Sequence, residues 1–468
     1  MPLDMPPDEF RRYGHQVVDW IADFLADPHR LPVLPSNPPG SLTRQLPPEA
    51  PVQGEPMDRI LQDFERLIVP HSTIWNHPRF FSYFSVSTSG PGILAEALIA
   101  TLNMNGMLWQ SSPAVTELEQ VTLGWLRKWL GLPESFFGMI HDTASNSTFH
   151  AILAARAKAA PETRTAGAPA NLILYTSEHA HSSVEKAGLA LGLGRKNIRL
   201  IGTDESFAMK PQLLVEAIAA DRAAGLRPMC VAATIGTTST TAVDPVPAIA
   251  DICEREQLWL HVDGAYGGHM GVVPEYRHML DGVARADSFV VNPHKWLFTP
   301  IDLSAFYVRQ PEVLREALSL VPEYLRTGQD AQVVNYMDYT VPLGRRFRAL
   351  KLWFVMRYFG HEKIAALIRG HVEMAQRLAE RLSMDPRFEI CAPHPMSLVC
   401  FRMRGSDERN AVLFERLNQS GAGFFSKTSV GGRFMLRWAI GNIHTTWADI
   451  EDALGVLSRI SDDLASGQ

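Results

Sequence analysis

The sequence predicts an α/β protein with a mostly parallel central sheet, and two observations support that fold class. Short, nearly continuous apolar runs recur at residues 172–175, 230–235, 258–262 and 288–291. Segments with helical spacing lie between or beside them, at residues 149–160, 184–191, 213–224 and 248–256. Strands that are apolar throughout are typical of a parallel sheet covered by helices on both faces. Ligands bind such sheets at the carboxyl ends of the strands.

The N-terminal region has a different pattern. Phe10, Val17, Ile21 and Phe24 recur at close to helical spacing, which predicts an amphipathic helix over residues 8–26. Nine prolines follow between residues 28 and 56, and they favour an extended, semi-rigid segment over regular structure. We interpret residues 1–85 as a helical and proline-rich arm that is buried in an oligomer. A linker to a separate domain is the alternative.

The remainder divides into two regions. Ser112-Pro113 marks a helix start and Gly131 a helix end, so a helix is expected between them. The alternating apolar runs and helical segments described above come after this helix. After residue 344 come long helices, two strand candidates at residues 397–402 and 433–440, and a closing helix near residues 447–460. We therefore expect a large domain over residues 86–345 and a small α+β C-terminal domain over residues 346–468.

Composition excludes several classes of function. At 468 residues the chain is long enough for two or three domains, and its 46% hydrophobic and 20% charged content is that of a soluble globular protein. A net charge of −6 gives no support for binding nucleic acid or an anionic membrane. No apolar stretch would span a membrane, and the first residues do not resemble a signal peptide. Four widely spaced cysteines disfavour a disulfide framework or zinc site, so we expect a cytoplasmic protein without a metal.

Two strand ends carry charged residues that point to one cofactor. The run at residues 258–262 is followed by Asp263, and the run at residues 288–291 by Asn292-Pro293-His294-Lys295-Trp296. A lysine amine bonds covalently to an aldehyde cofactor and is displaced by a substrate amine. A buried carboxylate needs a partner, which a protonated pyridine nitrogen supplies. Lys295 and Asp263 therefore predict pyridoxal 5'-phosphate (PLP). A surface lysine and an aspartate that caps the next turn are the alternatives.

Two further segments fit that cofactor. Thr143-Ala144-Ser145 precedes the helical segment at residues 149–160, and a helix N-terminus offers N–H groups and a positive dipole end to a phosphate. His181 follows the run at residues 172–175, next to a Ser182-x-x-Glu185 capping box. A histidine at that junction can stack on a cofactor ring. Taken singly, both segments are also what an ordinary helix start contains.

Together these motifs resemble those of the group II PLP-dependent decarboxylases, specifically the aromatic L-amino-acid decarboxylases. The similarity runs through nearly the whole chain and is carried by residues 77–84, 111–119, 180–184, 235–238, 260–266, 292–296 and 342–347. It implies the PLP-dependent transferase fold type I, which is aspartate-aminotransferase-like, with a central seven-stranded sheet. It also implies a homodimer in which residues 1–85 form the dimerisation arm.

The resemblance implies roles for single residues. Lys295 bonds to PLP, Asp263 pairs with the ring nitrogen, and His181 stacks on the ring. In the family, a mobile loop of the neighbouring subunit closes the site with a catalytic tyrosine. Counting back from Pro342 matches Tyr336 with that tyrosine, in a loop over residues 325–339. The other expected cofactor contacts are Thr143, Ala144, Ser145, Thr238, Ala265, Asn292 and His294.

The implied function is decarboxylation of aromatic L-amino acids (Phe, Tyr, dopa or Trp) to arylalkylamines and CO2. Dopa-type members commonly have Pro-Thr where this chain has Ser85-Val86, and valine cannot form a hydrogen bond with a ring hydroxyl. Arg79 is a candidate for binding an acidic side chain, with a surface role as the alternative. The expected substrate-binding residues, most of which core packing would explain equally well, are Trp75, Phe80, Tyr83, Phe84, Val86 and Trp109.

Three other functions stay open. Related enzymes make aryl acetaldehydes by oxidative deamination, and in them the loop tyrosine is typically Phe or the stacking histidine is replaced. The presence of both Tyr336 and His181 favours decarboxylation. An aminotransferase on the same fold would use Arg437 as its carboxylate clamp. A non-catalytic paralogue is disfavoured, because the sequence has all four residues expected to act in catalysis: Lys295, Asp263, His181 and Tyr336.

Overall fold

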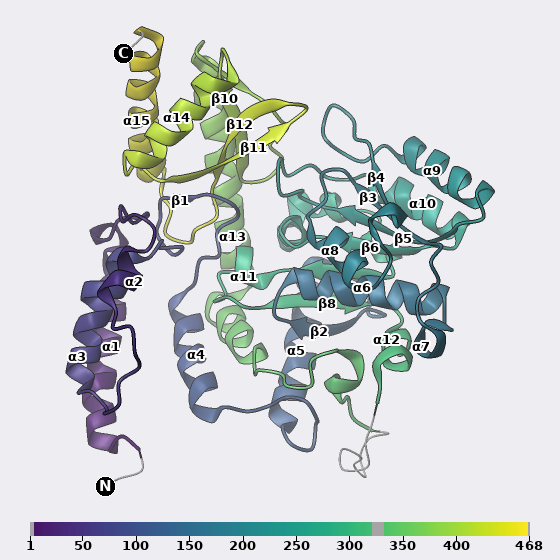
Figure 1. Ribbon diagram of the computed structural model, residues 1–468, viewed down its shortest axis with the longest axis horizontal. Coiled ribbons are helices and arrows are strands. Elements are labelled where there is room, and N and C mark those ends of the chain that lie inside the picture. Colours follow the sequence, from purple (N-terminus) through teal and green to yellow (C-terminus); the bar gives the residue numbers. More distant parts are fainter. Residues whose placement is uncertain (1–3, 321–331, 467–468) are drawn as a thin grey trace.

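In the computed structural model, which describes residues 4–320 and 332–466, an N-terminal arm stands beside two sheets with their helices (Figure 1). The larger sheet has seven strands and the smaller one has five. Within these described ranges, no helix has the length and apolar character that a membrane span requires.

The arm contains the helix expected from its apolar spacing. Its proline-rich segment is mostly irregular, but a short helix, α2, forms in the proline-free stretch between Pro39 and Pro47. The first and third helices lie side by side, and Tyr13 Oη donates to Asp58 Oδ2 at 2.8 Å between them. The elements of the arm are α1 (Pro7–Ala26), α2 (Ser41–Gln45), α3 (Met57–Asp63) and β1 (Phe80–Phe81).

The seven-stranded sheet has the order β2-β8-β7-β6-β5-β3-β4. All neighbouring strands are parallel except at β8, which is antiparallel to both β2 and β7. The predicted α/β class and mostly parallel sheet are therefore confirmed, and the four predicted apolar runs are β3, β5, β6 and β7. The strands are β2 (Phe137–His141), β3 (Leu172–Ser177), β4 (Ile198–Ile201), β5 (Arg227–Thr234), β6 (Trp259–Asp263), β7 (Ser288–Val291) and β8 (Ser304–Val308).

Helices cover both faces of this sheet. Along β5, Val231 and Ala233 join the apolar cluster formed with α5, α9 and α10, whereas Cys230 and Ala232 join the cluster formed with α6, α8 and α12. Alternate side chains point to opposite faces of a strand, so both faces are buried. The helices are α4 (Gly90–Leu102), α5 (Pro113–Leu130), α6 (Ala144–Ala159), α7 (Thr163–Ala166), α8 (Ser183–Ala190), α9 (Pro211–Ala223), α10 (Val246–Glu256), α11 (Pro293–Trp296) and α12 (Pro311–Leu318).

The smaller sheet has the order β1-β11-β12-β10-β9, so a strand of the arm pairs with the C-terminal region. Here β1 is parallel to β11, and the other neighbours are antiparallel. The domain limits expected at residues 85 and 345 stay predictions. The C-terminal elements are α13 (Ala349–Met384, kinked at Gly360), β9 (Phe388–Ile390), β10 (Leu398–Met403), α14 (Asp407–Gln419), β11 (Phe424–Val430), β12 (Arg433–Ala439) and α15 (Trp447–Ser466).

Candidate active site

A cavity of about 200 Å³, here called the inner cavity, lies at the carboxyl ends of the parallel strands. It brings together all ten residues that the sequence predicts as cofactor contacts. Four residues that were not predicted as cofactor contacts complete its wall: Phe84, Thr234, Gly236 and Tyr266. The ten predicted residues are Thr143, Ala144, Ser145, His181, Thr238, Asp263, Ala265, Asn292, His294 and Lys295.

Lys295 and Asp263 reach the inner cavity from neighbouring strands. The lysine follows β7 on α11, and its backbone N–H donates to Asn292 O at 2.8 Å. Desolvation lowers the pKa of the Lys295 amine, while the nearby Asp263 carboxylate acts to raise it. A lowered pKa increases the fraction of neutral, nucleophilic amine. Asp263 Oδ1 accepts the Ala265 N–H at 2.9 Å, and no described residue donates to its Oδ2, which is left for a positively charged partner.

His181 is held by its own turn. Its Nδ1 accepts the Ser183 N–H at 3.2 Å and lies 2.8 Å from Ser183 Oγ. A neutral His181 therefore carries its proton on Nε2. Desolvation lowers the pKa of His181, and the Asp263 carboxylate opposes that shift. The imidazole is thus a flat ring that lines the inner cavity together with Lys295.

The N-terminus of α6 and the side chain of His294 can donate hydrogen bonds to a phosphate in the inner cavity. Thr143 is the N-cap residue of α6, and the first N–H groups of a helix have no partner within the helix. His294 Nδ1 accepts the Leu303 N–H at 2.9 Å, and burial lowers the pKa of His294 to about 3, so Nε2–H is its donor. Asn292 Oδ1 is buried without a hydrogen-bond partner.

These groups fit PLP. Lys295 provides an amine for its aldehyde, Asp263 an anion for its ring nitrogen, and the α6 N-terminus a site for its phosphate. The unpartnered Asn292 Oδ1 is a further polar contact for a ligand in the cavity. Across the described residues there is no group of three or more His, Cys, Asp or Glu side chains that could hold a metal ion.

A larger cavity of about 610 Å³, the outer cavity, adjoins the inner one and shares four wall residues with it. Four of the six predicted substrate contacts line it: Trp75, Tyr83, Phe84 and Val86. Its remaining wall residues are Asn76, Thr88, His181, Thr238, Lys295, Pro300 and Ile301.

Two predicted substrate contacts lie outside both cavities. Phe80 is buried in β1, where its ring packs 4.4 Å from Trp75 and 5.4 Å from Phe424. Trp109 donates through Nε1 to Glu117 Oε1 at 2.8 Å, on the loop before α5. Phe80 is therefore a packed residue in this chain, and the role of Trp109 in substrate binding stays a prediction.

Tyr336 also lies away from the inner cavity. Its side chain is fully buried, its Oη donates to Gly138 O at 3.3 Å, and the Arg345 guanidinium lies 4.3 Å from its ring centre. A proton donor must reach the reacting atoms, so this packing argues against that role in the inner cavity of the same chain. A role in a neighbouring subunit stays a prediction, and residues 325–331 of the expected loop lie outside the described ranges.

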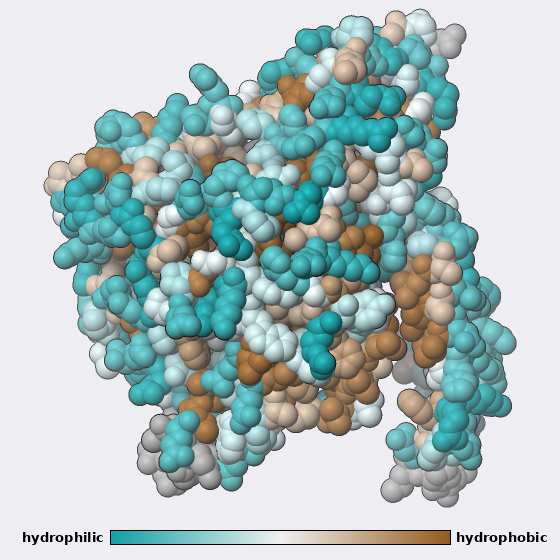
Figure 2. Space-filling model, turned by 180° about the vertical axis from the view of Figure 1, so that it is seen from behind, coloured by the Kyte–Doolittle hydropathy of each residue, from teal (hydrophilic) through white to brown (hydrophobic). Residues whose placement is uncertain are grey.

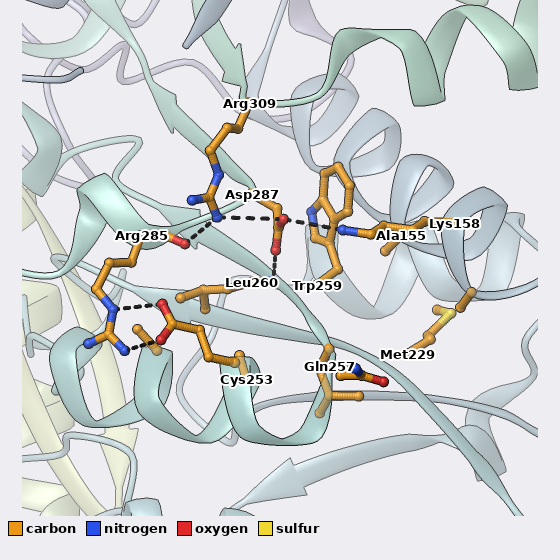
Figure 3. Close-up of a pocket in the computed structure, with 14 residues that line it drawn as sticks. Ala155, Lys158, Met229, Cys253, Gln257, Trp259, Leu260, Arg285, Asp287 and Arg309 are labelled. Carbon is orange, nitrogen blue, oxygen red and sulfur yellow. Dashed lines mark hydrogen bonds and ion pairs between the residues drawn. The ribbon is translucent and has the colours of Figure 1, made fainter. Parts of the chain in front are cut away.

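A third cavity, of about 490 Å³, lies at the opposite, amino ends of β5, β6 and β7 (Figure 3). Its charged groups face one another. Asp287 Oδ1 lies 3.6 Å from Lys158 Nζ and 3.7 Å from Arg309 Nη2, and Asp287 Oδ2 accepts the Leu260 N–H at 2.9 Å. The two described carboxylates of this cavity are both paired, Asp287 with Lys158 and Arg309, and Glu254 with Arg285, which distinguishes the third cavity from the inner one.

Comparison with known proteins gives concordant matches. A family model described as pyridoxal-dependent decarboxylase conserved domain matches residues 39–404. The aromatic-L-amino-acid decarboxylase of Cavia porcellus is 42% identical, over 93% of this chain and 94% of its own. The phenylacetaldehyde synthase of Arabidopsis thaliana is 40% identical, over 97% of this chain and 96% of its own. The crystal structure of Oryza sativa TDC with PLP and tryptamine has a TM-score of 0.96 at 38% identity, covering 99% of each chain.

Proposed function

Because the chain belongs to the pyridoxal-dependent decarboxylase family and is a PLP-dependent carboxy-lyase, we propose that it converts aromatic L-amino acids to arylalkylamines and CO2. The observation that carries the proposal is that the inner cavity and the outer cavity share wall residues, Lys295 and His181 among them. A substrate amine at Lys295 has its side chain beside Trp75, Tyr83 and Val86. This wall favours a flat, apolar group.

The outer cavity has no dedicated partner for an acidic side chain. Among its described wall residues, only His181 and Lys295 can carry positive charge, and both also line the inner cavity. Arg79, a candidate for that task, pairs instead with Asp449 at 3.2 Å and Asp452 at 2.6 Å. These contacts favour an aromatic substrate over an acidic one.

The residues of the inner cavity would hold PLP in one orientation. Lys295 would hold it covalently, Asp263 Oδ2 would keep a proton on the ring nitrogen, and the α6 N-terminus with His294 Nε2 would bind the phosphate. Bound PLP supplies an electron-accepting ring for the electron pair that remains when CO2 departs. The apolar wall of the outer cavity would exclude water around the reacting carbon.

A proton must then return to the α-carbon. Among the described residues that line both cavities, Lys295 and His181 have nitrogen atoms that can exchange protons. We assign this transfer to His181, because Ser183 orients its ring through Nδ1 and leaves Nε2 for the cavity. Tyr336 stays a prediction for a partner subunit, and its burial in this chain does not support the assignment.

An aminotransferase function has less support. Its candidate carboxylate clamp, Arg437, donates to Ser239 O at 3.0 Å, Thr238 O at 2.7 Å, Tyr83 O at 3.3 Å and Ser426 Oγ at 2.6 Å. Four of about five guanidinium donors are therefore already used. Arg437 lines neither cavity.

Formation of aryl acetaldehydes is the second candidate function. It is favoured by the 40% identity to a protein named phenylacetaldehyde synthase. Oxidation would consume one O2 and one water and release the aldehyde, hydrogen peroxide and ammonia together with CO2, so the two functions differ in their products. His181, which related oxidising enzymes can lack by the resemblance described above, favours the amine.

We further infer a homodimer. Phe10 and Val18 on α1 and Leu94 and Leu102 on α4 are apolar side chains that are more than half exposed. Figure 2 shows apolar surface on both sides of the gap between the arm and the rest of the chain. A second copy would cover such surface. Exchange of a loop near the active site and a cytoplasmic location remain proposals from the sequence.

A substrate screen tests the proposed function. The holoenzyme is incubated with Phe, Tyr, dopa, Trp and, as an acidic comparison, Glu, without a keto acid. Release of CO2 with equal amounts of amine from an aromatic substrate is expected. Release of CO2 from Glu alone, or a requirement for a keto acid, would refute the proposal. Equal amounts of aldehyde and peroxide in place of amine would instead support the second candidate.

A further inference from the structure

One wall of the outer cavity has an unfavourable backbone conformation. Tyr83 has φ = 50°, in the left-handed region that residues with a bulky side chain rarely adopt. Its ring lines the outer cavity and stacks on Trp75 at 5.6 Å, with 12° between the ring planes. Such a conformation persists only where neighbouring groups hold it.

The small sheet holds Tyr83 at both ends of its backbone. The Tyr83 N–H donates to Ser426 Oγ on β11 at 3.2 Å, and Arg437 Nη2 on β12 donates to Tyr83 O at 3.3 Å. Arg437 Nη1 also donates to Ser426 Oγ, at 2.6 Å. The arginine therefore fixes both the carbonyl of Tyr83 and the serine that fixes its N–H.

The same guanidinium contacts two other wall residues, Thr238 and Phe84, and also Ser239, which lines neither cavity. Its Nη2 donates to Thr238 O at 2.7 Å, and its Nε donates to Ser239 O at 3.0 Å. Its carbon Cζ lies 5.6 Å from the centre of the Phe84 ring. Arg437 is only 3% exposed. Its side chain connects the small sheet, to which it belongs, with the arm and with the loop after β5.

We propose that Arg437 is a positioning residue that sets the width of the outer cavity, and with it the selectivity for aromatic side chains. This inference rests on the proposed function. Its rival is a direct contact between the buried guanidinium and the substrate carboxylate. The four hydrogen bonds to three backbone carbonyls and a hydroxyl favour positioning, because a carboxylate ligand would have to displace them.

The two roles differ for a ligand that lacks a carboxylate. An arylalkylamine has the aromatic side chain and amine of the substrate and no carboxylate. Its dissociation constant is measured on the PLP-loaded protein by calorimetry, beside KM and kcat for the matching amino acid. The variants are Arg437→Lys, which keeps the charge and loses the planar fork, and Ser426→Ala, which keeps the arginine and removes the Tyr83 N–H contact.

We expect Arg437→Lys to raise KM and the amine dissociation constant together, each by about tenfold, or about 1.4 kcal/mol. We expect kcat to change by less than about threefold, because ground-state positioning acts mainly on KM. Ser426→Ala should raise both constants in the same direction, by about threefold. A rise of KM with an unchanged amine dissociation constant would assign Arg437 to the carboxylate and overturn the proposal. No change in either constant would also overturn it.

Arg402→Gln is the matched control. Arg402 is also buried in the small sheet, on β10, but its contacts stay within that region, to Gly405 O at 2.7 Å and Asp407 at 2.8 Å. Equal losses of amine binding in Arg402→Gln and Arg437→Lys would show general damage and reject a specific role. Amine binding is measured without turnover, so the role of Arg437 is tested independently of activity. Failure of the wild-type protein to release CO2 from aromatic amino acids is a separate result, and it would refute the proposed function.

Discussion

Replacing Asp263 by Asn changes charge at the inner cavity with little change in shape. Asp263 is 5% exposed, and its Oδ1 accepts the Ala265 N–H at 2.9 Å. The asparagine carbonyl can accept the same hydrogen bond, so the turn at Ala265 is retained. The charge at Oδ2 is lost, and an uncharged amide replaces it opposite the cofactor ring nitrogen.

The expected effect is large. Two unit charges roughly 4 Å apart attract by about 4 kcal/mol at an effective dielectric constant of about 20. That energy corresponds to a decrease of about three units in the pKa of the ring nitrogen. If only about 2.7 kcal/mol of it acts in the transition state, kcat falls about a hundredfold. Binding of PLP should persist, because the Lys295 and phosphate contacts are unchanged.

The assay compares kcat for CO2 release at saturating PLP and records the visible absorbance of the bound cofactor. Asp287→Asn is the matched control, because Asp287 Oδ2 likewise accepts a backbone N–H, that of Leu260 at 2.9 Å, at the amino ends of the same strands. We expect its kcat to match that of the wild type. An Asp263→Asn variant that binds PLP and retains more than about a tenth of wild-type kcat would refute the charge pairing.

Three further changes have defined outcomes. Tyr336→Phe removes a single 3.3 Å hydrogen bond to Gly138 O, so the free energy of unfolding should fall by about 0.5–1.5 kcal/mol. Assignment of the proton transfer to His181 predicts an unchanged amine-to-aldehyde ratio in this variant, and a shift to aldehyde would instead support Tyr336 of a partner subunit as the donor. Val86→Thr should lower KM for dopa relative to that for phenylalanine by about two- to tenfold, and an unchanged KM ratio would contradict a role of residue 86 in the outer cavity. Burial lowers the pKa of both His261 and His269 from 6.5 to about 4. Because the unfolded chain then binds protons that the folded chain does not, stability present above pH 6.5 is lost as pH falls, by up to about 1.4 kcal/mol per pH unit for each histidine. Equal free energies of unfolding near pH 7 and near pH 5, from urea titrations, would contradict that expectation.

The parts of the fold that the sequence predicts are those with a strong local signal. The runs that became β3, β5, β6 and β7 are apolar at nearly every position, because both faces of the sheet are covered. In the seven-stranded sheet, β2, β4 and β8 were not predicted. The edge strand β4 has Arg199 in its middle and is buried only at its ends. Such a short mixed pattern does not distinguish a strand from a loop.

The residues of the candidate site likewise divide into those with a local signal in the sequence and those without one. Lys295 and Asp263 could be predicted from the sequence because each follows the end of an apolar run, and the ends of neighbouring parallel strands lie close together. All ten predicted cofactor contacts line the inner cavity. The contacts of Arg437 with Tyr83 and Thr238 join residues more than a hundred positions apart, which no local pattern encodes. Tyr336 lies in a segment whose sequence gave no indication of its complete burial.

The most direct test of PLP-dependent decarboxylation uses a carboxyl-labelled aromatic L-amino acid with the PLP-loaded protein and no keto acid. We expect labelled CO2 and arylalkylamine in equal amounts from the wild type and from Lys158→Met, whose lysine lines the separate cavity at the amino ends of the strands. Lys295→Met should release neither. Labelled CO2 from Lys295→Met at the wild-type rate, or none from the wild type with PLP bound, would contradict the assignment of Lys295 and the inner cavity to this reaction.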